Sequence, residues 1–507
     1  MPPTPDVVLA AALERARQAA RDGIVRTQDL SRGDRELLVS RNWLREIIRG
    51  WYLLTTPEAK PGDTVIWHSS FWAFVGAYFR ERFGRRYCLS ADASLDLWSG
   101  AMGIPRQLTV LAASGGTSRI VLPAGNSILT YENAQNLPRD IVELNGVQVM
   151  SLGTALVRTT PTFFHLDPLT AEIAIRQVRR EDLTRALLAE WNAAAAGRLI
   201  GALSHQGRKS DAEAMRADCE AAGYRVTPKN PFERPALLAG LQFESPHAGR
   251  VAALWRKMQP AVLAARPAGP EPRPTQEAYL AQAQAVYVRD AYHSLSIEGY
   301  QVTPEIIERV ARGDWNPEAE RDRRQVDAMA ARGYFGAHER VIASIRETFE
   351  GHNAGEVFEH SLADWYRPLF GPSVQAGILE AWQLAGYRER RVFITGSSHV
   401  PPPREAVPAC METLFACLRD EPDGWVRAVL GHFIFVFIHP YADGNGRLAR
   451  FLMNLILASG GYYWVILRVE SRAGYIQALE SASVGGDVTP FAEFVAREMA
   501  ALASLPP

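Results

Sequence analysis

The sequence predicts a multidomain protein, in which an α+β N-terminal region containing a winged helix precedes an all-α C-terminal core with a short β-hairpin. The chain has 507 residues, of which 47% are hydrophobic, and this is too long for one ordinary core. Helix-like and strand-like patterns alternate up to about residue 200, whereas the pattern is strongly helical after a proline-rich stretch. We therefore expect the two halves of the chain to differ in fold class.

The chain is expected to divide into four segments. "AARPAGPEPRPTQEAY", residues 264–279, is rich in proline and disfavours both helix and strand, and a softer break lies at residues 224–235. We expect a winged-helix-like segment at 1–60, an α+β domain at 61–200, a helical connector with a proline-rich linker at 201–275, and a helical domain at 276–507.

Composition also limits the location of the protein. The net charge is −1, so the overall balance does not require nucleic acid, although a local basic face stays open. The four cysteines form no CxxC pair, which indicates reduced, buried thiols. The N-terminus is an Ala-rich helix pattern and no signal peptide, and the most apolar stretch, "VLGHFIFVFIHP", is too short for a membrane span. We expect a soluble, cytoplasmic protein.

The winged helix is expected in "TQDLSRGDRELLVSRNWLREIIRGWYLLT". This stretch indicates two short helices and a hairpin, whose strands "WLREII" and "GWYLLT" join at Arg49-Gly50. Together with "HSSFWAFVGAYFRERFG" it resembles the AbiEi-like antitoxin domains of abortive-infection systems. The resemblance implies binding of duplex DNA or autoregulation, through Arg32 and Arg35 on the second helix and Arg45 and Arg49 on the wing. A winged helix used only for protein contacts, or a plain α+β domain, is the alternative.

Three helices are expected after the linker. "QEAYLAQAQAVYVRDAYHSLSIEGY" has helical spacing of its apolar residues, and "GWVRAVLGHFIFVFI" is apolar nearly all round, which is typical of a buried central helix. Pro440 biases His439 away from the helical region, so the central helix should end at Ile438–His439. "RLARFLMNLILASGG" should form a further buried helix that stops at Gly460-Gly461.

The loop between the last two helices, "HPYADGNGRLAR", carries the chemistry. Gly444 and Gly446 permit backbone angles that other residues resist, and the next helix should begin near Gly446. Backbone N–H groups then converge with the positive end of the helix dipole, which suits a phosphate. A lone DGNG is more often only a turn.

The side chains of this loop add a base, a metal ligand and two cations. His439 has a pKa near neutrality and could accept a proton from a hydroxyl. Asp443 offers an oxygen ligand for Mg²⁺ on phosphates. Arg447 and Arg450 share one helix face and can clamp further phosphates. Each feature alone has a structural explanation, but together they indicate phosphate chemistry.

These residues resemble the signature of Fic (filamentation-induced-by-cAMP) proteins, His-Pro-Phe-x-Asp-Gly-Asn-Gly-Arg-x-x-Arg, with Tyr441 in place of Phe and expected to fill the same core position. The resemblance covers roughly residues 280–500. It implies an all-helical core and transfer of AMP from ATP to a hydroxyl of a target protein. The Lys that phosphorylating relatives tend to carry is Gly446 here, which favours AMP transfer.

The resemblance also implies roles for each matching residue. These are His439 as the base for the target Ser, Thr or Tyr, Asp443 as the ligand of Mg²⁺ (or Mn²⁺), Gly444, Asn445 and Gly446 as the cradle of the α-phosphate, Arg447 against the departing pyrophosphate, and Arg450 at the γ-phosphate.

Two flanking stretches resemble further parts of the family. "RRVFITGSSHVPPP", residues 390–403, indicates a β-hairpin that turns at Gly396-Ser397 and resembles the flap that docks targets by main-chain pairing, here through Thr395, Gly396 and His399. An ordinary surface hairpin is the alternative. "GYIQALESASVGGDVTPFAEFVA" resembles the helix beside the adenine, with Tyr475 as the wall for the base; Ser483 stands where the family often has Asn.

"SLSIEGY" indicates a helix end with an acid, capped by Gly299. A solvated Glu is the plain interpretation. Within the family, Ser294, Glu298 and Gly299 resemble the inhibitory helix, which implies that Glu298 pairs with Arg450 and fills the γ-phosphate position. A carboxylate there can also orient a water, as in relatives that remove AMP.

We therefore expect an autoinhibited protein adenylyltransferase with ATP as substrate. The alternative is a DNA-binding regulator or antitoxin-like protein whose Fic core senses a nucleotide. The expected partners are ATP and a protein with a hydroxyl side chain, and a homodimer is left open.

Overall fold

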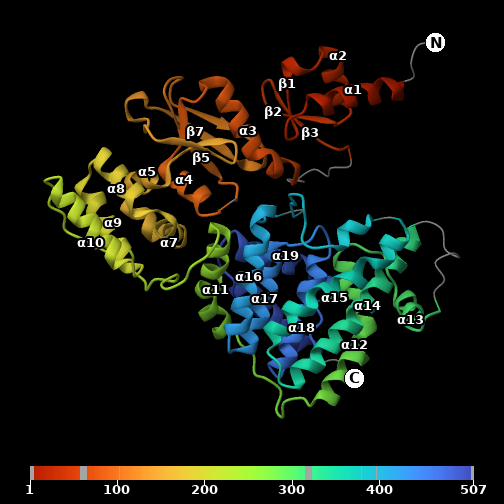
Figure 1. Cartoon of the computed structure of the whole chain (residues 1–507). Coiled ribbons are helices and arrows are strands. Elements are labelled where there is room, and N and C mark those ends of the chain that lie inside the picture. The colour runs from red at the N-terminus through yellow and green to blue at the C-terminus, as the bar shows by residue number, and fades with distance from the viewer. Residues whose placement is uncertain are drawn as a thin grey trace. The chain divides into compact units, whose positions relative to one another are not determined.

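The computed structural model describes residues 5–57, 65–101, 103–314, 323–377, 379–394 and 397–503. The chain packs as two compact units. Unit 1 is Met1–Leu241 with Phe393–Val400, and unit 2 is Gln242–Val392 with Pro401–Pro507 (Figure 1). The finer division into four domains stays a prediction.

The first part of unit 1 is a small sheet with helices. Its elements are α1 (Pro5–Ala19), β1 (Ile24–Arg26), η1 (Thr27–Asp29), α2 (Arg32–Ser40), β2 (Leu44–Ile48) and β3 (Trp51–Leu54). The strand order is β1-β3-β2, all antiparallel, with Leu53 opposite both Ile24 and Arg45. Gly50, at φ +89°, makes the tight turn between β2 and β3.

The hairpin predicted at these residues is present, but the first of the two predicted helices is only the 3₁₀ turn η1. The reason is local, because Leu30 is extended and Ser31 already serves as the N-cap of α2, accepting a hydrogen bond from the N–H of Asp34. Three residues are too few for an α-helix. The assignment as a winged helix stays a prediction.

The rest of unit 1 combines a mixed sheet with a set of short helices. Its strands are β4 (Tyr87–Leu89), β5 (Gln107–Ala112), β6 (Ser118–Val121), β7 (Ser127–Glu132), β8 (Ile141–Leu144) and β9 (Val147–Met150). Its helices are α3 (Val65–Phe83), α4 (Ala91–Trp98), η2 (Pro123–Gly125), η3 (Ala134–Asn136), α5 (Leu152–Arg158), α6 (Pro161–Leu166), α7 (Pro168–Gln177), α8 (Arg180–Ala189), α9 (Ala193–His205) and α10 (Lys209–Ala221). The sheet order is β4-β5-β7-β6, with β5 parallel to β7, and β8 pairs with β9. Strands and helices therefore alternate here, as the sequence predicts.

Unit 2 is helical throughout the part that the structure describes. Its elements are α11 (Pro246–Ala264), α12 (Gln276–Ile297), α13 (Pro304–Ala311), α14 (Arg323–Phe349), α15 (Ala354–Gln375), η4 (Ala381–Leu384), η5 (Arg404–Ala406), α16 (Val407–Asp420), α17 (Gly424–Ile438), α18 (Asn445–Ser459), η6 (Val469–Ser471), α19 (Arg472–Ser483) and α20 (Thr489–Ala503). Helix α17 is buried almost all round and packs against α18, as its apolar sequence predicts. Residues 265–275 lack regular structure, so the proline-rich break is real but α12 begins inside the predicted stretch.

The β-hairpin predicted at residues 390–403 is wrong for the described residues there, which contain no strand. Pro401, Pro402 and Pro403 lack backbone N–H groups, so the returning segment cannot form a ladder. The segment Phe393–Val400 belongs to unit 1, where Nδ1 of His68 lies 3.1 Å from the carbonyl oxygen of Ser397.

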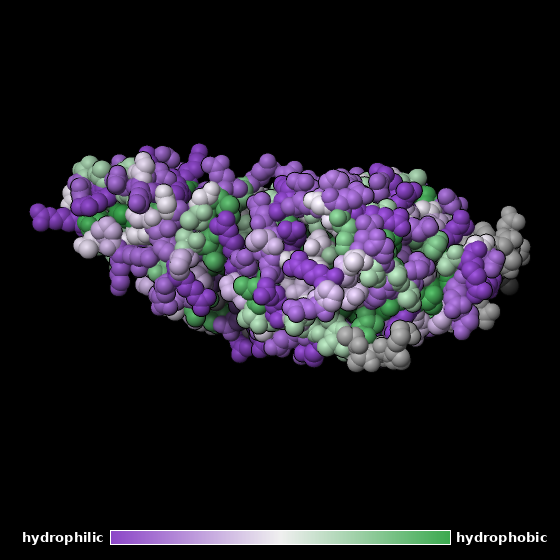
Figure 2. Space-filling view, turned by 90° about the horizontal axis from the view of Figure 1, so that it is seen from below, coloured by the Kyte–Doolittle hydropathy of each residue, from purple (hydrophilic) through white to green (hydrophobic). Residues whose placement is uncertain are grey.

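Hydrophilic residues cover most of the face in Figure 2, and hydrophobic residues form small separate patches on it. None of the helices in the described ranges has both the length and the hydropathy that a membrane crossing needs.

Candidate functional site

The loop that joins α17 to α18 has a specific backbone conformation. Helix α17 ends at Ile438, and His439 lies in the left-handed region at φ +53° and ψ +59°. Gly444, at φ +84°, is the N-cap of α18. The predicted helix–loop–helix is therefore confirmed within a residue at each boundary. The first N–H groups of a helix have no partner within the helix, so those of α18 are suited to bind an anion at this end.

His439 is set up as a neutral base. Its Nδ1 lies 3.3 Å from the carbonyl oxygen of Val436, and a carbonyl only accepts, so Nδ1 carries the proton and Nε2 keeps its lone pair. Burial lowers the pKa of His439 to about 4, and the charge of Arg388 acts in the same direction. At neutral pH the imidazole is therefore ready to accept a proton.

Two aromatic rings and an amide shape the loop. Asn445 accepts from the N–H of Tyr441 at 2.9 Å and donates to the carbonyl of Tyr441 at 2.8 Å. Tyr441 is buried and stacks on Tyr366 with ring centroids 4.0 Å apart. This is the core position that the sequence predicts for the aromatic residue after Pro440.

Arg447 lies almost fully buried at the start of α18. Its Nη2 donates to Asp443 at 3.1 Å. Its guanidinium carbon lies 4.9 Å from the ring centroid of Phe370 and 5.3 Å from that of Tyr300. The two rings contact the guanidinium by cation–π interactions. The side chain of Asp443 is 58% exposed.

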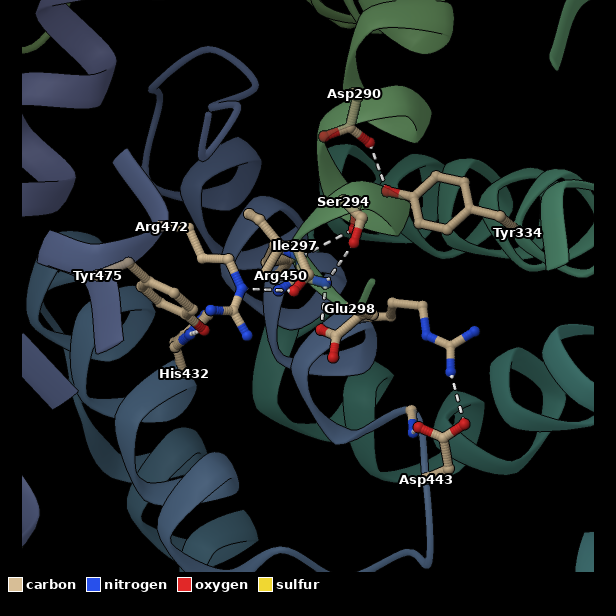
Figure 3. A network of polar contacts seen from close by, with 12 residues as sticks. Asp290, Ser294, Ile297, Glu298, Tyr334, His432, Asp443, Arg450, Arg472 and Tyr475 are labelled. Carbon is tan, nitrogen blue, oxygen red and sulfur yellow. Dashed lines mark hydrogen bonds and ion pairs between the residues drawn. The ribbon is translucent and has the colours of Figure 1, made fainter. Parts of the chain in front are cut away.

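Arg450 is held by the end of α12. Its Nε donates to Ser294 Oγ at 2.8 Å, and its Nη2 donates to the Ser294 carbonyl at 3.0 Å and to Glu298 Oε1 at 2.7 Å (Figure 3). The arginine is buried, and the glutamate is 28% exposed. Burial acts to raise the pKa of the Glu298 carboxyl, but the charges of Arg450 and Arg447 outweigh it and the pKa is lowered. Glu298 is therefore an anion within the cluster of arginines.

The backbone freedom expected of the two glycines is found only at Gly444. Gly446 lies in α18 with an ordinary helical φ, so that part of the prediction is wrong. A Cβ at position 446 would overlap Glu298 Oε1 and lie 3.2 Å from Arg450 Nη1. Space, not conformation, requires glycine here.

The end of α12 is fixed from several sides. Gly299, at φ +93°, closes the helix, and the N–H of Tyr300 donates back to the carbonyl of Leu295. Arg472 of α19 donates from Nε to the carbonyl of Ile297 at 2.8 Å (Figure 3). Within α12, the buried carboxylate of Asp290 accepts a hydrogen bond from the hydroxyl of Tyr334 at 2.6 Å.

Sequence reasoning missed two arginines that bond to the backbone of this site, Arg472 and Arg388. The Nε of Arg388 donates to the carbonyl of His439 at 2.8 Å. Neither belongs to a short motif, and each lies far along the chain from its acceptor, so no local pattern marks them.

Tyr475, predicted as the wall for the base, is only 3% exposed. Its hydroxyl lies 2.9 Å from Nε2 of His432, and its ring contacts Phe491 and Phe494. In this state the ring is part of the helical core, and contact with a nucleotide base stays a prediction. The hydroxyl of Ser483 donates to the carbonyl of Leu479.

The predicted docking residues give a mixed result. Thr395 and Gly396 lie outside the described residues. The N–H of His399 donates to Ser397 Oγ at 3.0 Å, so it is not free for main-chain pairing.

Of the predicted DNA-binding arginines, Arg32 pairs with Glu36 and Arg35 donates to the carbonyl of Thr27. Arg45 and Arg49 are exposed.

The residues around Asp443 fit a nucleotide-bound metal better than a metal held by protein alone. In the part of the chain that the structure describes, no group of three or more His, Cys, Asp or Glu could hold a metal ion. Mg²⁺ commonly takes one or two carboxylates and completes its shell with phosphates and water. Arg447 Nε and Arg450 Nη1 are buried without hydrogen-bond acceptors among the described residues, which suits an anionic ligand.

Comparisons with known proteins find similar sequences for part of the chain. The protein adenylyltransferase Fic of Nematostella vectensis is 41% identical over 115 residues, which are 22% of this chain and 26% of that protein. A probable protein adenylyltransferase of Aquifex aeolicus is 30% identical over 174 residues, which are 34% and 51%. The chain thus spans about a quarter to a half of the length of these relatives.

A solved structure of Fic-1 from Caenorhabditis elegans covers 69% of this chain and 96% of its own, with 18% identity and a TM-score of 0.37. Residues 360–457, which include the loop and both arginines described above, match the Fic/DOC family. This stretch of the chain is therefore a Fic domain.

Proposed function

We propose that this protein is a protein adenylyltransferase whose activity is held down by Glu298. The observation that carries the proposal is the 2.7 Å ion pair between Glu298 and Arg450, the last arginine of the Fic signature. Because Nε and Nη2 of Arg450 already donate to Ser294 and Glu298, these two donors are not available to a terminal phosphate in the same arrangement.

The transfer step follows from the loop. Nε2 of His439 accepts the proton of a target Ser, Thr or Tyr hydroxyl, and the oxygen attacks the α-phosphorus of ATP. A phosphoester bond forms, the α–β phosphoanhydride bond breaks, and pyrophosphate leaves with the electron pair. Arg447 stabilises the charge on the leaving group, and the N–H groups at the start of α18 hold the α-phosphate.

Asp443 would hold Mg²⁺ or Mn²⁺, which neutralises phosphate charge when it is bound with ATP. The exposed position of its carboxylate suits that role. Removal of AMP from modified targets is a second candidate activity. It is favoured by the partial exposure of Glu298, since a carboxylate beside the phosphate site can orient a water.

Incorporation of label from α-labelled ATP into protein tests the proposal. Glu298→Gly should raise incorporation by about 10²- to 10³-fold, since a partly buried pair of this kind is worth a few kcal/mol. Glu277→Gly, the same change in the exposed first turn of α12, is the matched control and should label like wild type. Equal labelling by wild type and Glu298→Gly would overturn autoinhibition by this residue. A double variant Glu298→Gly/His439→Ala that still transfers would overturn the role of the base.

A further inference from the structure

Arg388 makes an unusual set of contacts between η4 and η5. Its guanidinium is buried. Nε donates to the carbonyl of His439 at 2.8 Å, Nη2 to that of Pro402 at 2.5 Å and, more weakly, to that of Ile438 at 3.5 Å, and Nη1 to that of Arg390 at 3.2 Å. Its own backbone N–H donates to the carbonyl of Pro440 at 2.9 Å.

These acceptors fall into two groups. The carbonyls of Ile438, His439 and Pro440 are the turn where α17 ends and the catalytic loop begins. The carbonyls of Arg390 and Pro402 flank the segment 391–401, which includes the stretch Phe393–Val400 that groups with unit 1. One side chain thus joins the backbone of the histidine to both ends of this segment.

The energetics argue against a role in packing alone. Every hydrogen bond that the structure gives this guanidinium ends on a backbone carbonyl, and burial lowers its pKa to about 10. A buried cation without a bonded anion costs free energy. The N–H groups of the guanidinium offset that cost because they donate hydrogen bonds to several carbonyls at once.

We propose that Arg388 is a positioning residue for AMP transfer, which fixes the backbone of His439 and the ends of segment 391–401 in one geometry. The inference rests on the proposed function. His439 lies in the left-handed region, which costs a non-glycine residue roughly 1 kcal/mol or more. The bond to its carbonyl helps to hold that conformation, and with it the direction in which Nε2 points.

The charge of Arg388 has a second effect on the same residue. The charged groups that act on the imidazole are Arg388, Glu298 and Asp443. Arg388 lowers the pKa of His439, whereas the two carboxylates act to raise it. Arg388 therefore favours the neutral imidazole that can accept a proton.

Variants of the full chain in the Glu298→Gly background test the proposal, because transfer is then measurable. Arg388→Met removes the donors and keeps the length. It should lower turnover by about 10²-fold, the usual result of misplacing a catalytic group by about 1 Å. The dissociation constant of ATP should stay within about threefold. Arg388→Lys keeps the charge and should recover part of the turnover.

Arg427→Met is the matched control. Arg427 lies on α17 and its donors also end on a backbone carbonyl, that of Glu421, away from the loop. It should leave turnover unchanged. If Arg388→Met does not fold, as judged by thermal unfolding, Arg388→Lys decides: slowed turnover at unchanged ATP affinity supports the proposal, and parental turnover overturns it.

The outcomes separate this inference from the proposed function. Absence of label with Glu298→Gly itself overturns the proposed function, and this inference with it. Label with Glu298→Gly and undiminished turnover with Arg388→Met overturns the inference alone. An equal loss with Arg427→Met, or a loss of ATP affinity that matches the loss of turnover, also overturns it.

Discussion

His439 and Arg450 lie at opposite ends of the signature and are prepared in opposite ways. The histidine is held by Val436 and Arg388 in a neutral, accepting form. Arg450, in contrast, is bonded to Ser294 and Glu298, so a carboxylate of the chain lies against the arginine that we propose for the substrate's terminal phosphate. Under the proposed function, regulation would act by occupying Arg450, while His439 keeps the same conformation and protonation state.

Replacement of His439, the proposed base, is expected to have the largest effect on turnover. In the Glu298→Gly background, His439→Ala should lower turnover by roughly 10²-fold or more, because no other group accepts the proton of the target. ATP affinity should stay within a few-fold, since the imidazole acts on the hydroxyl. Initial rates of labelling and ATP titration measure the two effects separately.

Asp443→Ala is the counterpart at the metal position and should weaken Mg²⁺-dependent ATP binding instead. Equal losses of ATP affinity in the histidine and aspartate variants would contradict the two roles.

A smaller effect is expected at the support of the inhibitory helix. Arg472→Ala removes the donor to the Ile297 carbonyl, one residue before Glu298. The bond should be worth about 1.5 kcal/mol or more, so labelling should rise by about tenfold through partial release of Arg450. Arg468→Ala is the control, because Arg468 bonds to Glu498 instead. Wild-type labelling by Arg472→Ala would show that α12 holds Glu298 without this bond.

The rate of labelling should depend only weakly on pH, whereas a base with the usual pKa of histidine would give a strong dependence. The lowered pKa, about 4, means that the base form persists as pH falls below the usual value of 6.5. Labelling by Glu298→Gly at saturating ATP should therefore change less than about twofold between pH 7.5 and 5.5. A rate that halves near pH 6.5 would contradict a prepared base.

The weakest effect is expected in unit 1. Full-length protein should bind duplex DNA weakly at low salt, and replacement of Arg32, Arg35, Arg45 and Arg49 by Ala should reduce binding and its salt dependence. Arg45 and Arg49 should contribute more, since Arg32 already pairs with Glu36. Unchanged binding after all four replacements would rule out this surface, and no binding at low salt would rule out the activity.

The parts of this molecule that the sequence predicts well are those determined by neighbours along the chain. The end of α17 and the cap at Gly299 each follow from adjacent residues, whereas the burial of Tyr441 was expected through the family resemblance. The pairing of Glu298 with Arg450 could be expected only through the family resemblance. Arg388 and Arg472 were missed because their acceptors lie distant in sequence. The hairpin predicted at 390–403 is wrong because three prolines follow Val400, and proline has no backbone N–H to donate to a partner strand.

The glycine at 446 has a consequence for how this chain can change by mutation. Its backbone would accept any residue, yet a side chain there would overlap the carboxylate of Glu298. A single replacement at this position would therefore expel the inhibitor while leaving His439 and Arg388 in place. A single mutation at either of two positions, 298 at the end of α12 or 446 in α18, should thus separate the carboxylate from Arg450. A screen of variants by incorporation of label from α-labelled ATP should return changes at both.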